Sequence, residues 1–145
     1  MMQAREVGAE IPEIEVRIPS RAEWVALARL AVATVAARMH FNVDEIADLK
    51  LAVAEACTNA IQHARESDEI VITCRIYHDG LQITVRDFGI GTEAERIRSR
   101  DLGEPRVGGL GVYLIRELMD EVEYRVERDS GTVLTMFKRF GDSSR

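Results

Sequence analysis

The chain has 145 residues, of which 46 % are hydrophobic, and this size and apolar content suit one domain, residues 1–145, with an ordered core of about residues 11–140. Its 19 basic and 25 acidic residues give a formal charge of -6, which disfavours direct contact with nucleic acid. No apolar run approaches the roughly 18 residues of a membrane span, and the polar N-terminus lacks the apolar centre of a signal peptide. We therefore expect a cytoplasmic protein without a membrane partner.

The N-terminal part of the chain predicts a strand followed by a helix. Apolar and charged residues alternate over residues 13–18, which is the period of a half-buried strand. Ser20 and Glu23 have the spacing of a capping box, in which the two side chains satisfy backbone N–H groups at a helix start. We therefore expect a first helix from residue 21 to about residue 39.

The second helix carries the same signature at its start. Asn42 can cap it, Glu45 lies three residues later, and Phe41 is placed to pack against Ile46. We expect this helix to continue to residue 64 or 65.

The next two predicted elements are strands over residues 70–77 and 81–86, joined by a hairpin turn at Asp79 and Gly80. A long, glycine-rich and charged segment then covers residues 87–111, and a connection of this length is usually functional or disordered.

The C-terminal part predicts a helix over residues 112–119 and strands over residues 122–126 and 132–138. The complete order is strand, two helices, two strands, loop, helix and two strands. This order predicts an α+β fold, a two-layer sandwich in which a mainly antiparallel mixed sheet carries the helices on one face.

A polar stripe runs along the second predicted helix. Glu55, Asn59 and His63 follow one another at intervals of four residues, so they share one side of the helix, beside a row of alanines. Small side chains beside polar ones allow a ligand to approach the helix closely. The alternative is that the alanines admit a closely packed strand while the polar stripe faces water. His63 is equally explained as a helix-end cation that balances the helix dipole.

Two glycine motifs accompany this stripe. Asp87 ends a predicted strand and opens the segment Asp-Phe-Gly-Ile-Gly, and Gly109-Leu110-Gly111 leads into a helix, where bare amides suit a phosphate. The Asp-Phe-Gly tripeptide lacks the other motifs of eukaryotic-type protein kinases. The chain also has no third glycine for a dinucleotide fingerprint and no Gly-Lys-Ser/Thr for a P-loop.

The polar stripe, the two glycine motifs and Gly131-Thr132 together resemble the GHKL ATPase fold, also called the Bergerat fold, of gyrase, the Hsp90 chaperone and histidine kinases. Residues 51–64, Leu-Ala-Val-Ala-Glu-Ala-Cys-Thr-Asn-Ala-Ile-Gln-His-Ala, are most similar to the anti-sigma factor serine/threonine-protein kinases. The resemblance covers nearly the whole chain.

This resemblance implies ATP and Mg²⁺ as cofactors and gives roles to three residues. Asn59 matches a magnesium ligand, which agrees with the preference of this cation for oxygen. Glu55 matches the general base that activates the attacking hydroxyl. Asp87 matches the aspartate that accepts a hydrogen bond from the adenine amino group; the alternative is a turn-capping aspartate.

Further residues are assigned to the nucleotide by the same resemblance: Gly89, Gly91, Arg106, Gly109, Leu110, Gly111 and Thr132. The first two glycines make room for the base, and those before the helix offer amides to phosphates. Thr132 supports the base pocket or is an ordinary strand residue, and Arg106 adds charge or is simply solvated. Residues 92–107 correspond to a lid.

The implied function is a kinase that transfers the γ-phosphoryl group of ATP to a serine of an anti-anti-sigma partner with a STAS domain, and that also sequesters a sigma factor. A non-catalytic, nucleotide-gated switch protein of the same fold is the alternative, and Glu55 favours the enzyme. The resemblance further implies a homodimer, for which the apolar residues of the first strand offer a surface; the alternative is that this edge strand is simply covered.

Overall fold

The computed structural model describes residues 11–63, 68–89, 107–127 and 131–141. Its strands are β1 (Glu13–Pro19), β2 (Glu69–Tyr77), β3 (Gly80–Asp87), β4 (Glu121–Glu127) and β5 (Gly131–Arg139). Its helices are the short 3-10 helix η1 (Ala22–Trp24) and the α-helices α1 (Val25–Ala37), α2 (Val43–His63) and α4 (Val107–Leu118).

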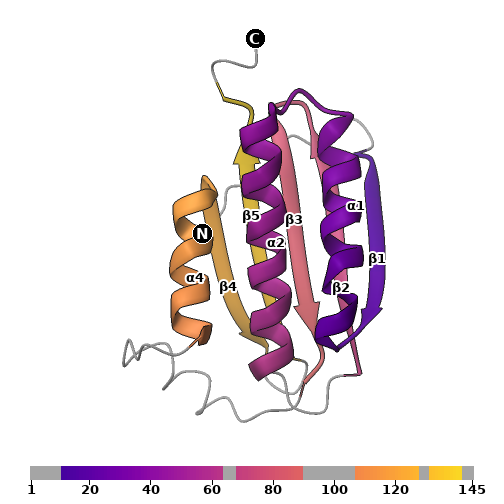
Figure 1. Ribbon diagram of the computed structural model, residues 1–145, viewed down its shortest axis with the longest axis vertical. Helices are drawn as coiled ribbons and strands as arrows, with labels where there is room; N and C mark the ends of the chain where they lie inside the picture. Colours follow the sequence, from indigo (N-terminus) through magenta and orange to yellow (C-terminus); the bar gives the residue numbers. More distant parts are fainter. Residues whose placement is uncertain (1–10, 64–67, 90–106, 128–130, 142–145) are drawn as a thin grey trace.

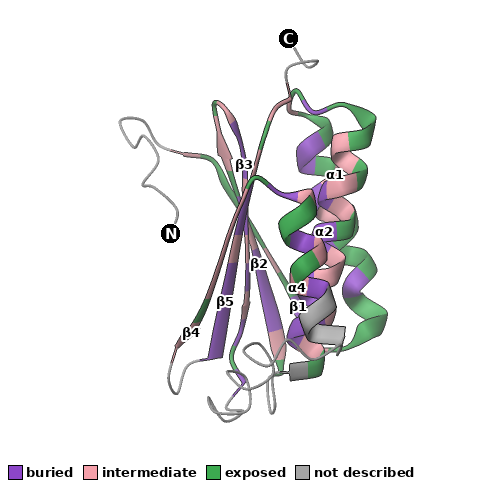
Figure 2. Cartoon of the chain, turned by 90° about the vertical axis from the view of Figure 1, so that its left-hand side faces the viewer, coloured by how far each residue is buried: buried purple, intermediate pink, exposed green. Residues whose placement is uncertain are grey.

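The five strands form one sheet in the order β1-β2-β3-β5-β4, and each of the four pairings is antiparallel. The helices α1, α2 and α4 lie side by side on one face of this sheet (Figures 1 and 2). The predicted two-layer α+β sandwich is therefore confirmed, with an antiparallel sheet throughout the described strands.

The core lies between the helices and the sheet. Its strand residues alternate along the chain, because every second side chain of a strand points to the same face. The fully buried examples include Ile70 and Ile72 of β2 and Ile83 of β3. From the helix layer, Leu49 of α2 and Ile115 of α4 are also fully buried.

The start of α2 confirms the predicted capping box. The backbone N–H of Asn42 donates to Glu45 Oε1, and the backbone N–H of Glu45 donates to Asn42 Oδ1, both at 2.8 Å. Phe41 is buried, and Ile46 packs against the same hydrophobic core. The helix start is therefore fixed by both the reciprocal cap and the neighbouring apolar residues.

The capping box predicted at Ser20 and Glu23 is wrong. The chain forms η1 before α1, Arg21 takes the N-cap position in an extended conformation, and it makes no side-chain cap hydrogen bond. The reason is that Ser20 still belongs to the sheet end, where its backbone N–H donates to the carbonyl of Asp68 at 3.0 Å. The helical turn therefore begins one residue later than the sequence pattern indicated.

The helix α4 begins at Val107, five residues before the predicted start at residue 112. The prediction treated the glycines at 108, 109 and 111 as a loop because glycine is a poor helix former. Packing overrides this preference, because Ile115 of α4 is fully buried and α4 packs against α2.

Cys57 and Cys74 are both buried and free. Burial raises the pKa of the Cys57 thiol to about 12 and that of Cys74 to about 11, so neither is a nucleophile near neutral pH. In the part of the chain that the structure describes, no helix has the length and apolar character needed to cross a membrane.

Candidate functional site

The row of alanines and the polar stripe of α2 lie in different surroundings. Ala52 and Ala56 are buried in the core against the sheet, so the small residues do serve close packing. Asn59, however, is only 6 % exposed, and Glu55 is half-buried, so this part of the stripe does not simply face water. His63 ends α2, and its side chain lies outside the described part of the structure.

Asp87 and Thr132 face each other at one end of the sheet. They are register partners on β3 and β5, and they are 4 % and 3 % exposed. Asp87 Oδ1 accepts hydrogen bonds from the backbone N–H of Thr132 at 3.2 Å and from that of Gly89 at 3.1 Å. Two backbone donors on one oxygen hold the carboxylate in place.

The alternation of strand residues places this pair on the helix side of the sheet. Asp87 lies two residues beyond Val85 and four beyond Ile83, and both of these belong to the core under the helices. Thr132 is related in the same way to Leu134 on β5. The carboxylate therefore lies on the same face of the sheet as α2.

Gly131 has a structural role that the sequence reasoning did not assign. Its φ is +105°, and a Cβ at this position would collide with the backbone carbonyl of Asp87 and with Cα of Phe88. Only glycine permits both this conformation and this approach. The sequence Asp129-Ser130-Gly131 is typical of a turn, but the contact with Asp87 becomes visible only when β3 and β5 are paired.

The elements that carry these residues meet at one end of the molecule. The C-terminal end of α2, the end of β3, and the starts of β5 and α4 lie together at the lower end in Figure 1. The two helices also approach closely there, because a Cβ built on Gly111 of α4 would lie 3.2 Å from Glu55 Oε1.

Buried oxygen atoms without partners identify where a ligand fits. Among the described residues, three buried side-chain atoms have no hydrogen-bond partner: Asn59 Oδ1, Asp79 Oδ1 and Thr132 Oγ1. Asp79 lies in the β2–β3 turn, whereas the other two belong to the site that the sequence indicated. An unsatisfied buried oxygen costs about 1–3 kcal/mol, so a ligand or water that bonds to it is favoured.

These oxygens suit the chemistry of a nucleotide with its magnesium ion. Magnesium takes oxygen ligands and normally combines one or two protein oxygens with phosphates and water. The described residues contain no group of three or more His, Cys, Asp or Glu side chains able to hold a metal. Asn59 Oδ1 fits as a single protein ligand.

Part of the predicted site lies outside the described residues. This applies to Gly91, Arg106 and residues 92–106 of the predicted lid. Gly109 and Leu110 belong to the first turn of α4, although their surroundings are not described. Gly111 is the fifth residue of α4, so its N–H lies beyond the N–H groups that a helix start leaves unpaired.

Known proteins resemble this chain over most of its length. The family model "Histidine kinase-like ATPase domain" matches residues 18–138. The "Serine-protein kinase RsbW" of Bacillus cereus (strain Q1) is 42 % identical over 136 residues, which cover 87 % of this chain and 84 % of that protein. The protein of the same name from Bacillus anthracis (strain A0248) is 41 % identical over the same coverage.

A solved structure shares the fold. It is the histidine kinase domain from the blue-light activated histidine kinase EL346 of Erythrobacter litoralis, with a TM-score of 0.54 and 19 % sequence identity. The match covers 88 % of this chain and 64 % of that chain. At this identity the likeness concerns the fold alone.

Proposed function

Since the chain belongs to the RsbW family of serine-protein kinases and carries a histidine kinase-like ATPase domain, we propose that it transfers the γ-phosphoryl group of ATP to a serine of an anti-anti-sigma protein. The observation that carries this proposal is the pair of unpartnered buried oxygens, Asn59 Oδ1 and Thr132 Oγ1, at the end of the sheet where Asp87 lies. We also propose that the protein acts in the cytoplasm, where ATP is available.

The adenine end of the nucleotide is assigned to the ends of β3 and β5. The Asp87 carboxylate is fixed by hydrogen bonds from the backbone N–H groups of Thr132 and Gly89. In our proposal it accepts a hydrogen bond from the adenine amino group. Guanine offers a carbonyl oxygen at this position, and two acceptors facing each other are repulsive. Thr132 Oγ1 bonds to the base directly or through water.

The phosphates are assigned to the start of α4 and to α2. Unpaired N–H groups in the first turn of α4, which includes Gly109, attract anionic oxygens. Asn59 Oδ1 holds magnesium, which, when bound, offsets negative charge on the phosphates. Arg106 and Leu110 complete this part of the proposal, with residues 92–106 as the lid, whereas Gly91 makes room for the base.

Glu55 is the proposed general base. The serine Oγ attacks the γ-phosphorus and forms a new O–P bond, while the bond from this phosphorus to the β–γ bridging oxygen breaks and ADP leaves. The Glu55 carboxylate takes the proton of the serine hydroxyl. Its half-buried position one helical turn before Asn59 allows it to reach a serine presented from outside.

The product of this reaction also explains regulation. A phosphoserine adds about 1.5–2 negative charges at neutral pH, which weakens a docking surface on an acidic protein of net charge -6. In our proposal the partner is a STAS-domain protein, and its release leaves the kinase available to sequester a sigma factor.

A phosphotransfer assay with Glu55→Ala tests this function. With radiolabelled ATP, magnesium and a purified STAS-domain protein from the same organism, we expect the variant to lose about 100-fold or more in rate while retaining ATP affinity. Glu117→Ala, which removes an exposed glutamate of α4, serves as the matched control. If the wild type binds ATP but transfers nothing, the protein is instead a nucleotide-gated switch.

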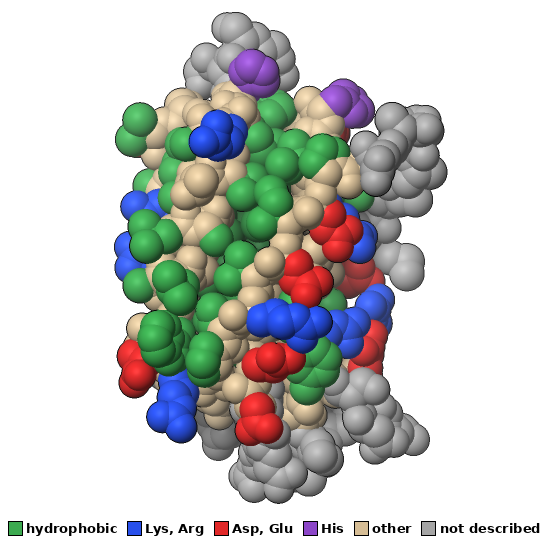
Figure 3. All heavy atoms as spheres, turned by 90° about the vertical axis from the view of Figure 1, so that its right-hand side faces the viewer, with side chains coloured by type: hydrophobic (Ala, Val, Ile, Leu, Met, Phe, Trp, Pro, Cys, Tyr) green, Lys and Arg blue, Asp and Glu red, His purple; other side chains and the backbone are tan. Residues whose placement is uncertain are grey.

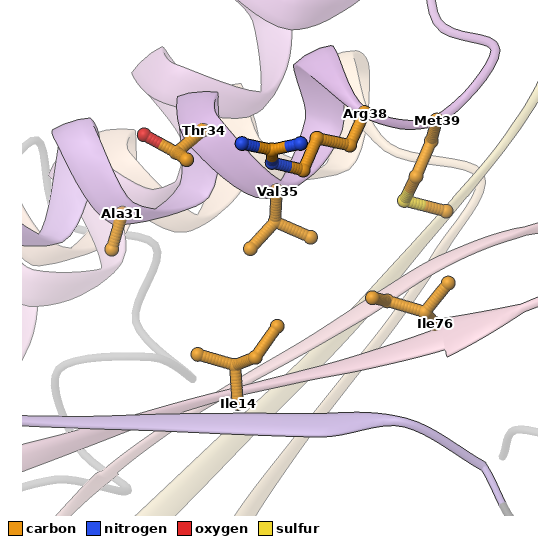
Figure 4. A pocket seen from close by; sticks show the side chains of 7 residues that line it. All are labelled: Ile14, Ala31, Thr34, Val35, Arg38, Met39 and Ile76. Carbon is orange, nitrogen blue, oxygen red and sulfur yellow. The ribbon is translucent and has the colours of Figure 1, made fainter.

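We also propose a homodimer formed through β1 and α1. β1 is an edge strand, and hydrophobic side chains gather beside it on this side of the molecule (Figure 3). Leu27 and Leu30 of α1 are 46 % and 62 % exposed. A pocket of about 400 Å³ opens between Val35 of α1, Ile14 of β1 and Ile76 of β2 (Figure 4).

The charges of β1 match a second copy of the same strand. If two β1 strands paired antiparallel about Val16, Glu15 of each would lie opposite Arg17 of the other, which is a favourable cross-strand pair. The backbone edge would then be covered rather than exposed. The same pairing would bring the apolar faces of the two α1 helices together.

Sedimentation velocity tests this arrangement. We expect the wild type to sediment as a dimer and Leu30→Glu to sediment as a monomer, because Leu30 lies on the proposed surface and is too exposed to stabilise the core. Val43→Glu changes an 81 % exposed residue at the start of α2 and is expected to leave the dimer intact. A wild-type monomer, or a Leu30→Glu dimer, would refute this interface.

A further inference from the structure

Gly111 contacts the side chain to which the proposed function gives the role of base. It is buried within α4, and a Cβ at this position would lie 3.2 Å from Glu55 Oε1 on α2. This separation is shorter than ordinary van der Waals contact between carbon and oxygen. The hydrogen of Gly111 therefore leaves just enough room for the Glu55 carboxylate.

The usual reasons for a glycine do not apply to this position. Among the described glycines only Gly131 has a positive φ, so Gly111 does not need an unusual backbone conformation. Within a helix, glycine is about 1 kcal/mol less favourable than alanine. Its N–H lies beyond the unpaired groups of the helix start. The feature that distinguishes glycine from alanine here is the close approach of Glu55.

An added methyl group would move the carboxylate rather than the helices. Ala52 and Ala56 of α2 and Ile115 of α4 are buried in the core, so both helix backbones are held against the sheet. Glu55 is half-buried and ends in a flexible carboxylate, which can shift by a few tenths of an ångström or rotate away. A small displacement of a catalytic group is enough to lower a rate strongly.

We propose that Gly111 is a positioning residue, which sets the location of the Glu55 carboxylate by the absence of a side chain. This inference rests on the proposed role of Glu55 as base. It gives the glycine of α4 a function in the chemical step that is separate from phosphate binding.

Steady-state kinetics of Gly111→Ala test this inference. We expect kcat to fall roughly tenfold, while the affinity for magnesium-ATP, measured by calorimetry, stays within about twofold and the melting temperature does not decrease. A structural role would lower the melting temperature, and a phosphate-binding role would weaken ATP binding.

A second background isolates the contact. The side chain of the Glu55→Asp variant is one methylene shorter, so its carboxylate lies farther from Gly111. We expect this variant to be slow, and we expect the addition of Gly111→Ala to leave its kcat unchanged. An equal fall in both backgrounds, or wild-type kcat in Gly111→Ala, would overturn the positioning role while leaving Glu55 as base. If Glu55→Ala transferred phosphate at the wild-type rate, Glu55 would not be the general base, and the positioning role of Gly111 would be refuted as well.

Discussion

Asp87 shows how the backbone prepares one side chain for recognition. Its Oδ1 is already bonded to the N–H groups of Gly89 and Thr132, so the carboxylate is oriented before a ligand arrives. Preorganised acceptors lose little conformational entropy on binding. The neighbouring Gly131 makes this arrangement possible, because any larger residue would displace the Asp87 backbone.

We therefore expect Gly131→Ala to lower the free energy of unfolding by roughly 2 kcal/mol or more, since the positive φ alone costs about 1–2 kcal/mol and the methyl group also collides with Asp87. Urea denaturation measures this change. Gly141→Ala, beyond the end of β5, is the control and is expected to stay within about 0.5 kcal/mol of the wild type. Equal stability of the two variants would contradict the close contact at Gly131.

Residues such as Asn59 and Asp87 could be identified from the sequence because their spacing and flanking glycines form a recognisable pattern. The role of Gly131 could not, since it depends on a contact with a residue 44 positions earlier. The same is true of Gly111, whose relation to Glu55 arises from the packing of α4 on α2.

At the scale of elements, the start of α2 is the feature that local sequence determines most completely. The reciprocal hydrogen bonds of Asn42 and Glu45 involve only neighbouring residues, so the pattern was sufficient to predict them. The start of α1 was predicted wrongly because Ser20 bonds to Asp68, which is distant in sequence.

This difference gives a direct prediction. Asn42→Ala is expected to destabilise the protein by about 1 kcal/mol through loss of the cap, whereas Ser20→Ala, which removes no cap hydrogen bond, stays within about 0.5 kcal/mol of the wild type. Chemical denaturation of the two variants measures both values. If Ser20→Ala lowered the free energy of unfolding as much as Asn42→Ala, Ser20 would cap the first helix after all.

The helix α4 illustrates the limit of local propensity. Three glycines near its start predicted a loop, yet the helix already includes them. Isolated short helices are unstable in water, and tertiary packing supplies most of their stability. The burial of Ile115 and the contact with α2 provide that packing, and neither is visible in the residues of α4 alone.

At the scale of the whole molecule, the strand order creates the candidate site. β5 pairs with β3 although α4 and β4 lie between them in the chain, and this pairing places Thr132 opposite Asp87. Strand periodicity predicted the individual strands but contained no information on their order. The resemblance of the motifs to known ATPases supplied the expectation that these distant segments meet.

The central claim is that α2, α4 and the ends of β3 and β5 form one nucleotide site. Titrating ¹⁵N-labelled protein with magnesium-ATP, while following backbone amide resonances, tests it most directly. We predict that the amides of Asn59, Gly89, Gly111 and Thr132 shift together with a single Kd. Unchanged spectra at millimolar nucleotide, or shifts confined to the pocket between α1 and β1, would contradict the account.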